Sequence, residues 1–166
     1  MLEQLFKPKS IAIVGASSDS LKVGNIILRN IASSFSGKIY PVNNKSTEIS
    51  GYTAYKNLRD IKGQVDLVVI VVPRDAVPGV MEDAAAVKAG AAIIITSGFR
   101  ETDEHGAELE DKIMATAREN NIRVLGPNTI GLITPEVNAT FAFADVKRGK
   151  AAIVAQSGGL GVYMLK

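Results

Sequence analysis

Short β-branched apolar runs alternate with longer helical stretches along this chain, and that alternation limits the folds open to it. The runs at residues 11–14, 38–42 and 66–72 are typical of strands, and residues 66–72 place apolar side chains on both faces. Strands of that kind occur in parallel sheets that are covered by helices on both sides. Because crossovers between parallel strands are right-handed, the pattern predicts an α/β fold with a doubly wound, Rossmann-like parallel sheet.

Two further strands and three helices complete the predicted sheet. We expect the strands at residues 91–95 and 122–125. The helices are expected at about residues 23–32, from Asp75 as the N-cap to Gly90 as the C-terminal cap, and over residues 103–120.

A second strand-and-glycine-loop unit begins near the end of the sequence. Residues 151–155 have the composition of a strand, and residues 156–161 follow it as a glycine-rich loop. A single strand with part of a helix cannot bury its own apolar surface. We therefore expect a first domain over residues 1–145 and, over residues 149–166, the first strand and loop of a second, truncated α/β domain.

Composition and charge exclude several classes of function. The net charge of +2 is small and evenly spread, so a nucleic-acid interface is not expected. The chain has no cysteine, which excludes disulfides and cysteine nucleophiles, and its single histidine argues against a metal site. No apolar run is long enough to span a membrane, and the N-terminal residues lack the features of a signal peptide, so a cytoplasmic protein is expected.

Ligands of such sheets bind beyond the carboxyl ends of the strands, where five loops carry candidate contacts. The glycines and serines of the first loop precede a helix N-terminus, whose N–H groups and dipole favour phosphate, although a tight turn would use the same glycines. The proline of the third loop can end strand pairing or form a wall for an adenine ring. The candidates are Gly15, Ala16, Ser17, Ser18, Lys22 and Gly24; Asn43 and Lys45; Val72 and Pro73; Ile95, Thr96 and Ser97; and Asn128.

Lys45 follows the second predicted strand, where NAD-binding folds usually carry an acidic residue for the ribose diol. A cation at that place favours a ligand with an additional ribose phosphate, such as coenzyme A or NADP. A solvated lysine in a turn is the alternative interpretation. No catalytic constellation is visible, and His105, at the acidic start of a helix, is expected to be a surface residue.

Taken in order, the loops resemble those of the CoA-binding domain of ADP-forming acyl-CoA synthetases, relatives of the succinyl-CoA synthetase α subunit. The matching segments cover essentially the whole chain, at residues 10–17, 40–45, 66–73, 94–99, 126–128 and 155–160. The resemblance implies that the first loop and Lys45 bind the phosphates of coenzyme A, and that Ile95, Thr96 and Ser97 help to hold it. It also implies that Ser157, Gly158 and Gly159 form a phosphate loop of the second domain, where a helix N-terminus stabilises a phosphohistidine.

Two positions depart from that family. Its lysine loop often contains Asn-Pro-Lys, whereas this chain has Asn44 in place of the proline. The phosphorylated histidine of the family lies beyond residue 166, and His105 does not match it.

The leading hypothesis is therefore the CoA-binding N-terminal part of an ADP-forming acid–CoA ligase of the acetate–CoA ligase type. Such an enzyme interconverts acyl-CoA, ADP and phosphate with acid, CoA and ATP through a phosphohistidine, and this chain alone is expected to bind CoA without turning over. The implied partner is an ATP-grasp-type domain or β subunit in an oligomeric enzyme. The alternatives are a stand-alone CoA-binding module with a regulatory or carrier role, and an NADP-binding Rossmann protein.

Overall fold

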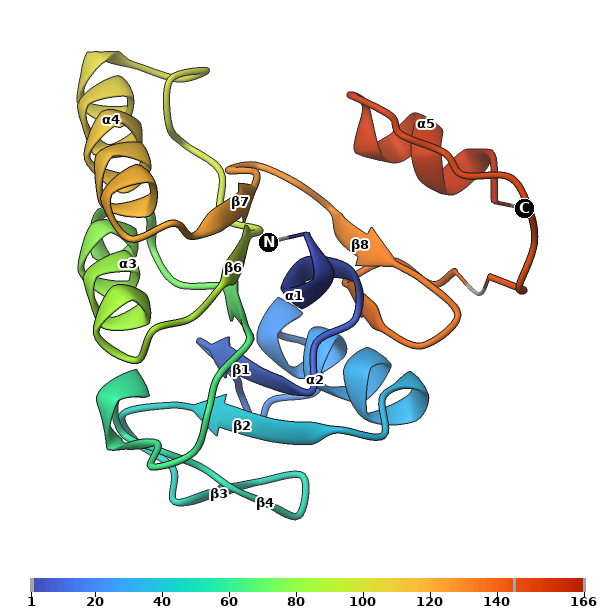
Figure 1. Cartoon of the computed structure of the whole chain (residues 1–166), viewed down its shortest axis with the longest axis horizontal. Helices are drawn as coiled ribbons and strands as arrows, with labels where there is room; N and C mark the ends of the chain where they lie inside the picture. Colours follow the sequence, from blue (N-terminus) through green and yellow to red (C-terminus); the bar gives the residue numbers. More distant parts are fainter. Residues whose placement is uncertain (1, 145, 166) are drawn as a thin grey trace.

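Five parallel strands form the central sheet of the computed structural model, which describes residues 2–144 and 146–165. Their order across the sheet is β2-β1-β5-β6-β7 (Figure 1). Ile11 of β1 lies beside Ile39 of β2 on one side and Leu67 of β5 on the other. The strands are β1 (Ser10–Val14), β2 (Lys38–Val42), β5 (Leu67–Ile70), β6 (Ala91–Ile94) and β7 (Arg123–Leu125). The predicted doubly wound parallel sheet is confirmed.

The strand order contains one change of direction, which marks where a ligand fits. From β1 the chain moves outward to β2 and then returns across β1 to β5, β6 and β7. The switch therefore lies between β1 and β5. In open α/β sheets the crevice outside the carboxyl ends of the strands at such a switch is the usual ligand site.

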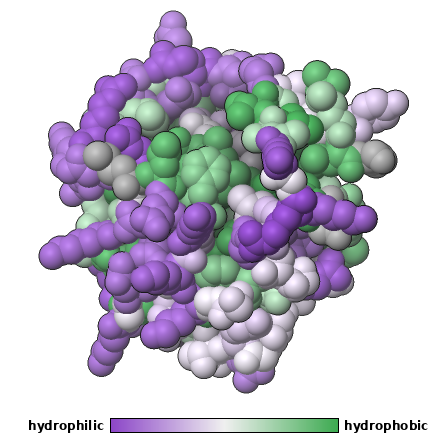
Figure 2. Space-filling view, turned by 45° about the vertical axis from the view of Figure 1, so that its right-hand side comes forward, coloured by the Kyte–Doolittle hydropathy of each residue, from purple (hydrophilic) through white to green (hydrophobic). Residues whose placement is uncertain are grey.

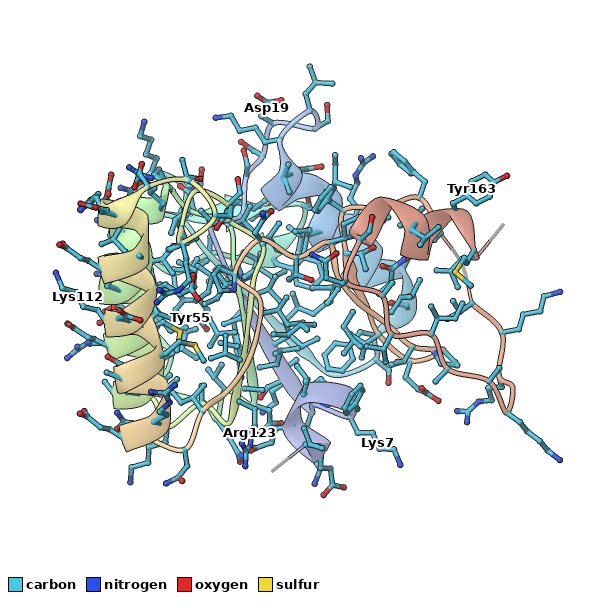
Figure 3. All side chains as sticks on the ribbon, turned by 90° about the horizontal axis from the view of Figure 1, so that it is seen from above. Lys7, Asp19, Tyr55, Lys112, Arg123 and Tyr163 are labelled. Carbon is cyan, nitrogen blue, oxygen red and sulfur yellow. The ribbon has the colours of Figure 1, made fainter. Side chains whose placement is uncertain are left out.

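Helices cover both faces of the sheet. Helices α1 (Glu3–Phe6) and α2 (Val23–Ser34) lie on one side, and α3 (Val77–Ala86) and α4 (Glu104–Glu119) lie on the other (Figures 1 and 3). Successive residues of one strand belong to the two different cores. In β5, Leu67 and Val69 pack in the cluster that contains α2, whereas Val68 and Ile70 pack in the cluster that contains α3 and α4. This two-sided burial is why the strands are apolar throughout.

An antiparallel hairpin that the sequence did not predict completes the cover over α2. It comprises β8 (Gly131–Ile133) and β9 (Asn138–Thr140). The Asn30 amide on α2 donates to the carbonyl oxygen of Thr140 at 2.8 Å. Val137 and Ala139 are buried in the same apolar cluster as α2. The hairpin therefore occupies a face where a further helix would otherwise be needed.

Smaller elements border the sheet. A second short hairpin, β3 (Glu48–Ile49) with β4 (Tyr52–Thr53), leads into Tyr55, which bridges to Val42 beside the outer strand β2. Two 3₁₀ turns, η1 (Leu58–Asp60) and η2 (Arg74–Ala76), precede β5 and α3. No helix among the described residues is long and apolar enough to cross a membrane.

The predicted helix boundaries are confirmed for α4 and wrong for α3. Asp103 is the N-cap of α4 and accepts from the Gly106 amide at 2.6 Å. Asp75, expected to cap α3, lies instead in the turn η2, and α3 has Ala76 as its N-cap without a side-chain bond. Helix α3 also ends before Gly90, because Lys88 takes the left-handed conformation (φ 56°) after its last turn.

The strand expected at residues 151–155 is absent: these residues have no regular secondary structure and no strand partner among the described residues, and all five are exposed. A strand needs a neighbour to receive its backbone hydrogen bonds, and this segment has none. After it, Ser157 begins the short helix α5 (Gly158–Tyr163) by accepting from the Leu160 amide at 3.4 Å. The predicted domain limits at residues 145 and 166 lie outside the described residues, so the division into two domains stays a prediction.

The C-terminal segment exposes apolar surface. Large side chains such as Phe143, Val154 and Tyr163 are mostly in solvent. Figure 2 shows apolar surface on the side of the molecule where this segment lies. Gly158 packs against Ile130, because a Cβ there would lie 2.4 Å from two atoms of the Ile130 side chain.

Candidate functional site

Two glycines allow the loop after β1 to pack closely against both the end of β5 and the first turn of α2. Gly15 has a φ of +95°, and a Cβ on it would lie 2.1 Å from the carbonyl oxygen of Val71 at the end of β5. A Cβ on Gly24, in the first turn of α2, would lie 2.0 Å from the carbonyl oxygen of Gly15. Any side chain at either position would push these elements apart. Gly15 and Gly24 therefore bring the first loop and the helix N-terminus against the switch point.

The N-terminus of α2 has no anionic group of its own. Its N-cap, Lys22, makes no side-chain cap bond, and the first turn contains no acidic residue. Ser17 accepts from the Asp19 amide at 3.1 Å, Ser18 is exposed, and Asp19 projects from the loop (Figure 3). Unpaired N–H groups and the helix dipole make such an end favourable for phosphate.

Asn25, which sequence reasoning did not select, lies buried beneath this loop. Its amide nitrogen donates to the carbonyl oxygen of Ser17 at 2.8 Å. Its amide oxygen is buried and has no hydrogen-bond partner among the described residues. Asn25 thus fixes the path of the loop, and its side-chain oxygen has no hydrogen-bond donor among the described residues. The only signal for it in the sequence was its place after Gly24, at the start of the predicted helix.

Asn43 joins the second loop to the first. Its side-chain nitrogen donates to the carbonyl oxygen of Ala16 at 2.7 Å. Its side-chain oxygen accepts from the backbone N–H groups of Lys45 at 2.8 Å and Ser46 at 3.0 Å. Asn43, predicted as a ligand contact, therefore uses its amide within the protein and sets the backbone of Lys45.

Lys45 and Lys22 carry the positive charge at this end of β1 and β2. Both side chains are exposed, and neither forms an ion pair in residues 2–144 or 146–165. Lys22 lies in the first loop as the N-cap of α2, and Lys45 follows β2, the two positions that the sequence indicated; their contact with a ligand stays a prediction.

The loops after β5, β6 and β7 are joined by hydrogen bonds. The Thr96 hydroxyl donates to the carbonyl oxygen of Val72 at 2.7 Å. The carbonyl oxygen of Thr96 accepts from the Asn128 amide at 2.9 Å. Ile95 is buried, whereas Pro73, Ser97 and Asn128 are exposed. Among the predicted residues of these loops, these three are thus the most accessible to a ligand.

Glu101 holds the loop after β6, a role that the sequence did not indicate. Its two carboxylate oxygens accept from the backbone N–H groups of Gly98 at 2.8 Å and Phe99 at 3.1 Å. Partial burial opposes ionisation of Glu101, but these N–H groups, its own N–H and the Asn128 side chain together lower its pKa.

Arg74 holds the other side of the same loop. Its guanidinium donates to the carbonyl oxygen of Gly98 at 2.7 Å and to the Asp103 carboxylate at 2.9 Å. Gly98 itself has a φ of +96°, which favours glycine. The Gly106 N–H and the Arg74 guanidinium lower the pKa of Asp103. His105 is exposed and lies 3.0 Å from the Asp75 carboxylate, as expected for a surface residue.

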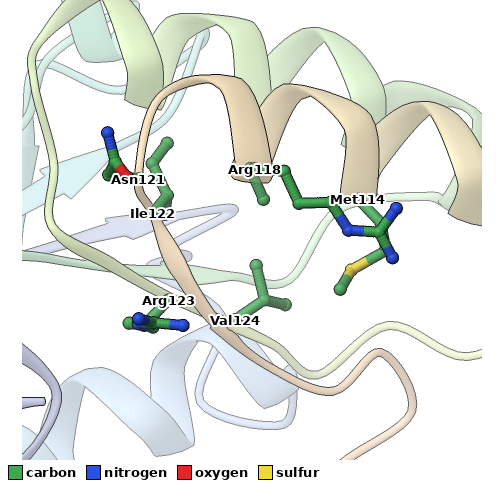
Figure 4. Close-up of a pocket in the computed structure, with 7 residues that line it drawn as sticks. Met114, Arg118, Asn121, Ile122, Arg123 and Val124 are labelled. Atoms are coloured by element: carbon green, nitrogen blue, oxygen red, sulfur yellow. The ribbon is translucent and has the colours of Figure 1, made fainter. Parts of the chain in front are cut away.

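Two hollows lie away from this edge. One of about 350 Å³ lies between the end of α4 and the outer strand β7, lined by residues such as Met114, Arg118 and Val124 (Figure 4). Another, of about 320 Å³, is lined by residues such as Gln4 and Asp66. Neither is lined by a predicted site residue. Among the described residues, no three His, Asp or Glu side chains are grouped as metal ligands.

The fold is a Rossmann-like domain whose carboxyl edge carries a helix N-terminus without a side-chain cap and two exposed lysines. The chain belongs to the CoA-binding domain family, whose sequence model, described as "CoA binding domain", matches residues 9–135.

Curated relatives extend the match to nearly the whole chain. It is 42% identical to subunit alpha of acetate–CoA ligase [ADP-forming] I of Pyrococcus furiosus, over 99% of this chain and 37% of the relative. It is 43% identical to acetate–CoA ligase [ADP-forming] of Methanocaldococcus jannaschii, over 96% of this chain and 22% of the relative. The chain thus spans little more than a third, or less, of the length of these relatives.

Solved structures agree. The dinucleotide-forming acetyl-coenzyme A synthetase 1 of Candidatus Korarchaeum cryptofilum, in complex with phosphate and ADP, superimposes with a TM-score of 0.94 at 42% identity. The match covers 99% of this chain and 36% of that one. A conserved hypothetical protein from Pyrococcus furiosus, at 27% identity and a TM-score of 0.55, is covered over 90% of its own length.

Proposed function

We propose that this chain binds coenzyme A along the carboxyl edge of its sheet and serves as the CoA-binding part of an ADP-forming acid–CoA ligase. The observation that carries the proposal is the family match over residues 9–135, joined to a carboxyl edge that presents an uncapped helix N-terminus and the exposed Lys45. The first feature suits the diphosphate of CoA, and the second suits its ribose 3′-phosphate.

The order of the strands gives the ligand a direction. Lys45 follows the outer strand β2, and the first loop follows β1. A ligand whose phosphates lie there can extend only toward β5, β6 and β7, because β2 is the edge of the sheet. Val72, Pro73, Ile95, Thr96, Ser97 and Asn128 would then face the pantetheine arm.

The remaining chemistry is assigned to parts beyond these residues. In the proposed reaction acyl-CoA, ADP and phosphate interconvert with acid, CoA and ATP through a phosphohistidine. His105 is the only histidine of the chain and is paired with Asp75 on the surface. We expect the reactive histidine, and an ATP-grasp-type domain or β subunit, to be supplied elsewhere in an oligomeric enzyme. Ser157, Gly158 and Gly159 are expected to contribute a phosphate loop beside it.

Calorimetric titration with CoA, dephospho-CoA, NADP and NAD tests the proposal. CoA should bind most tightly, and dephospho-CoA, which lacks the 3′-phosphate, should bind more weakly. Tighter binding of NADP than of CoA would contradict the proposal and favour an NADP-binding Rossmann protein.

A stand-alone CoA-binding module is the second candidate. It is favoured by the Pyrococcus furiosus hypothetical protein, in which this fold accounts for most of the chain. Immunoblotting of cells that make the protein separates the two: a species near 17.6 kDa favours the module, and a much larger one favours the ligase.

A further inference from the structure

The loop after β6 is held by the Glu101 carboxylate and the Arg74 guanidinium, which bond to opposite sides of Gly98. The N–H of Gly98 donates to Glu101 at 2.8 Å, while its carbonyl oxygen accepts from Arg74 at 2.7 Å. Because Gly98 has a φ of +96°, the peptide groups on its two sides point in directions that ordinary residues rarely allow. The neighbouring N–H of Phe99 also donates to Glu101.

The loop after β6 is also joined to the loop after β7. The Asn128 backbone N–H donates to the carbonyl oxygen of Thr96 at 2.9 Å. Asn128 has a φ of 56°, so its backbone is also held in an uncommon conformation. The two loops therefore share a backbone hydrogen bond next to the segment that Glu101 holds.

We propose that Glu101 is a positioning residue for coenzyme A, which holds the loop after β6 in the shape that receives the pantetheine arm. The inference rests on the proposed function and adds to it a residue that need not touch the ligand. Loss of Glu101 should therefore weaken binding of the pantetheine arm of CoA and leave binding of its nucleotide end, over β1 and β2, unaffected.

The test compares Glu101→Gln with the unchanged chain, using CoA and adenosine 3′,5′-bisphosphate as the two titrants. The bisphosphate carries the nucleotide and the 3′-phosphate but no pantetheine. Glutamine is nearly isosteric with glutamate but has one acceptor oxygen in place of two, so it cannot receive both N–H groups. We expect the affinity for CoA to fall about tenfold, and the affinity for the bisphosphate to stay within about twofold.

Glu108→Gln is the matched control, because Glu108 is an exposed carboxylate of α4 with no hydrogen bond or ion pair to the described residues. It should bind both titrants as the unchanged chain does. Thermal melting of each variant reports whether it folds.

The outcomes distinguish failure of the proposed CoA binding from failure of the positioning role of Glu101. If the unchanged chain fails to bind CoA, the proposed function fails. If it binds CoA and Glu101→Gln binds CoA equally well, or loses both titrants in equal proportion, the positioning role of Glu101 is wrong.

Discussion

Several side chains at the proposed site form hydrogen bonds to backbone groups, and these bonds fix the positions of the charged residues. The Asn43 side chain donates to the Ala16 carbonyl oxygen and accepts from the Lys45 and Ser46 backbone N–H groups. These bonds fix the position of the Lys45 backbone. The proline common at position 44 in the resembling family is thus not needed here to shape the turn. The site depends as much on such internal bonds as on the residues that would meet the ligand.

Lys45→Ala should weaken binding of CoA by about 1–2 kcal/mol, or roughly five- to thirtyfold, because it removes a charge-assisted contact that solvent partly screens. Binding of dephospho-CoA should be nearly unchanged. Calorimetry with both ligands makes the measurement. The matched control is Lys38→Ala, an exposed lysine at the opposite end of the same strand, β2. A loss with Lys38→Ala equal to that with Lys45→Ala would mean that only bulk charge matters.

At this scale the sequence predicted positions better than roles. Lys45 and Ser97 could be selected because each follows an apolar strand run, and the structure places both at the exposed carboxyl edge. Glu101, Arg74 and Asn25 could not be selected, because their partners are backbone groups of loops whose conformation no local pattern specifies.

Among the secondary-structure elements, the contact between α2 and the first loop decides whether the site forms. A Cβ at Gly24 would lie 2.0 Å from the Gly15 carbonyl oxygen, which is backbone and cannot turn away. The helix would have to move outward, and its N-terminus would leave the switch point.

Gly24→Ala should therefore destabilise the fold by about 1–3 kcal/mol, measured by denaturant unfolding. Gly79→Ala is the control, since Gly79 lies in α3 with no heavy atom within 4 Å of an added Cβ. That change should stabilise the chain by about 0.5–1 kcal/mol through helix propensity. Equal effects of the two substitutions would show that the close approach at Gly24 is unimportant.

The strands of the central sheet and the long helix α4 could be predicted, and the two small hairpins could not. The five strands and α4 follow from apolar patterning and the Asp103 cap. The strands β8 and β9 pair only with each other among the described residues and pack beside α2, a tertiary contact that no local pattern specifies. The strand predicted at residues 151–155 had suitable composition but no neighbouring strand among the described residues.

Over the whole molecule, the sheet separates two apolar clusters while the polar loops gather at its carboxyl edge. This division was predictable from the alternation of apolar runs. The proposed ligand edge is the one at which the carboxyl ends of the parallel strands meet, beside the change in strand order.

Acid should destabilise the folded chain through Glu101 and Asp103. Both pKa values lie below their usual values of 4.5 and 3.8, so the folded state favours the ionised carboxylates. Their stabilisation is complete above the usual values and is lost as the pH falls through the lower, folded ones. Thermal melting between pH 7 and pH 3 should show a falling Tm, with a smaller fall for Glu101→Gln. An equally steep fall in that variant would assign the effect to other groups.

We propose that coenzyme A lies along the carboxyl edge of the sheet. Backbone amide chemical shifts of the 17.6 kDa chain, recorded by NMR with and without CoA, test this placement. If CoA binds there, the shift changes will concentrate at residues 15–24, 43–45, 71–73, 95–98 and 128. Shifts that concentrate instead around the hollow between α4 and β7 would contradict it.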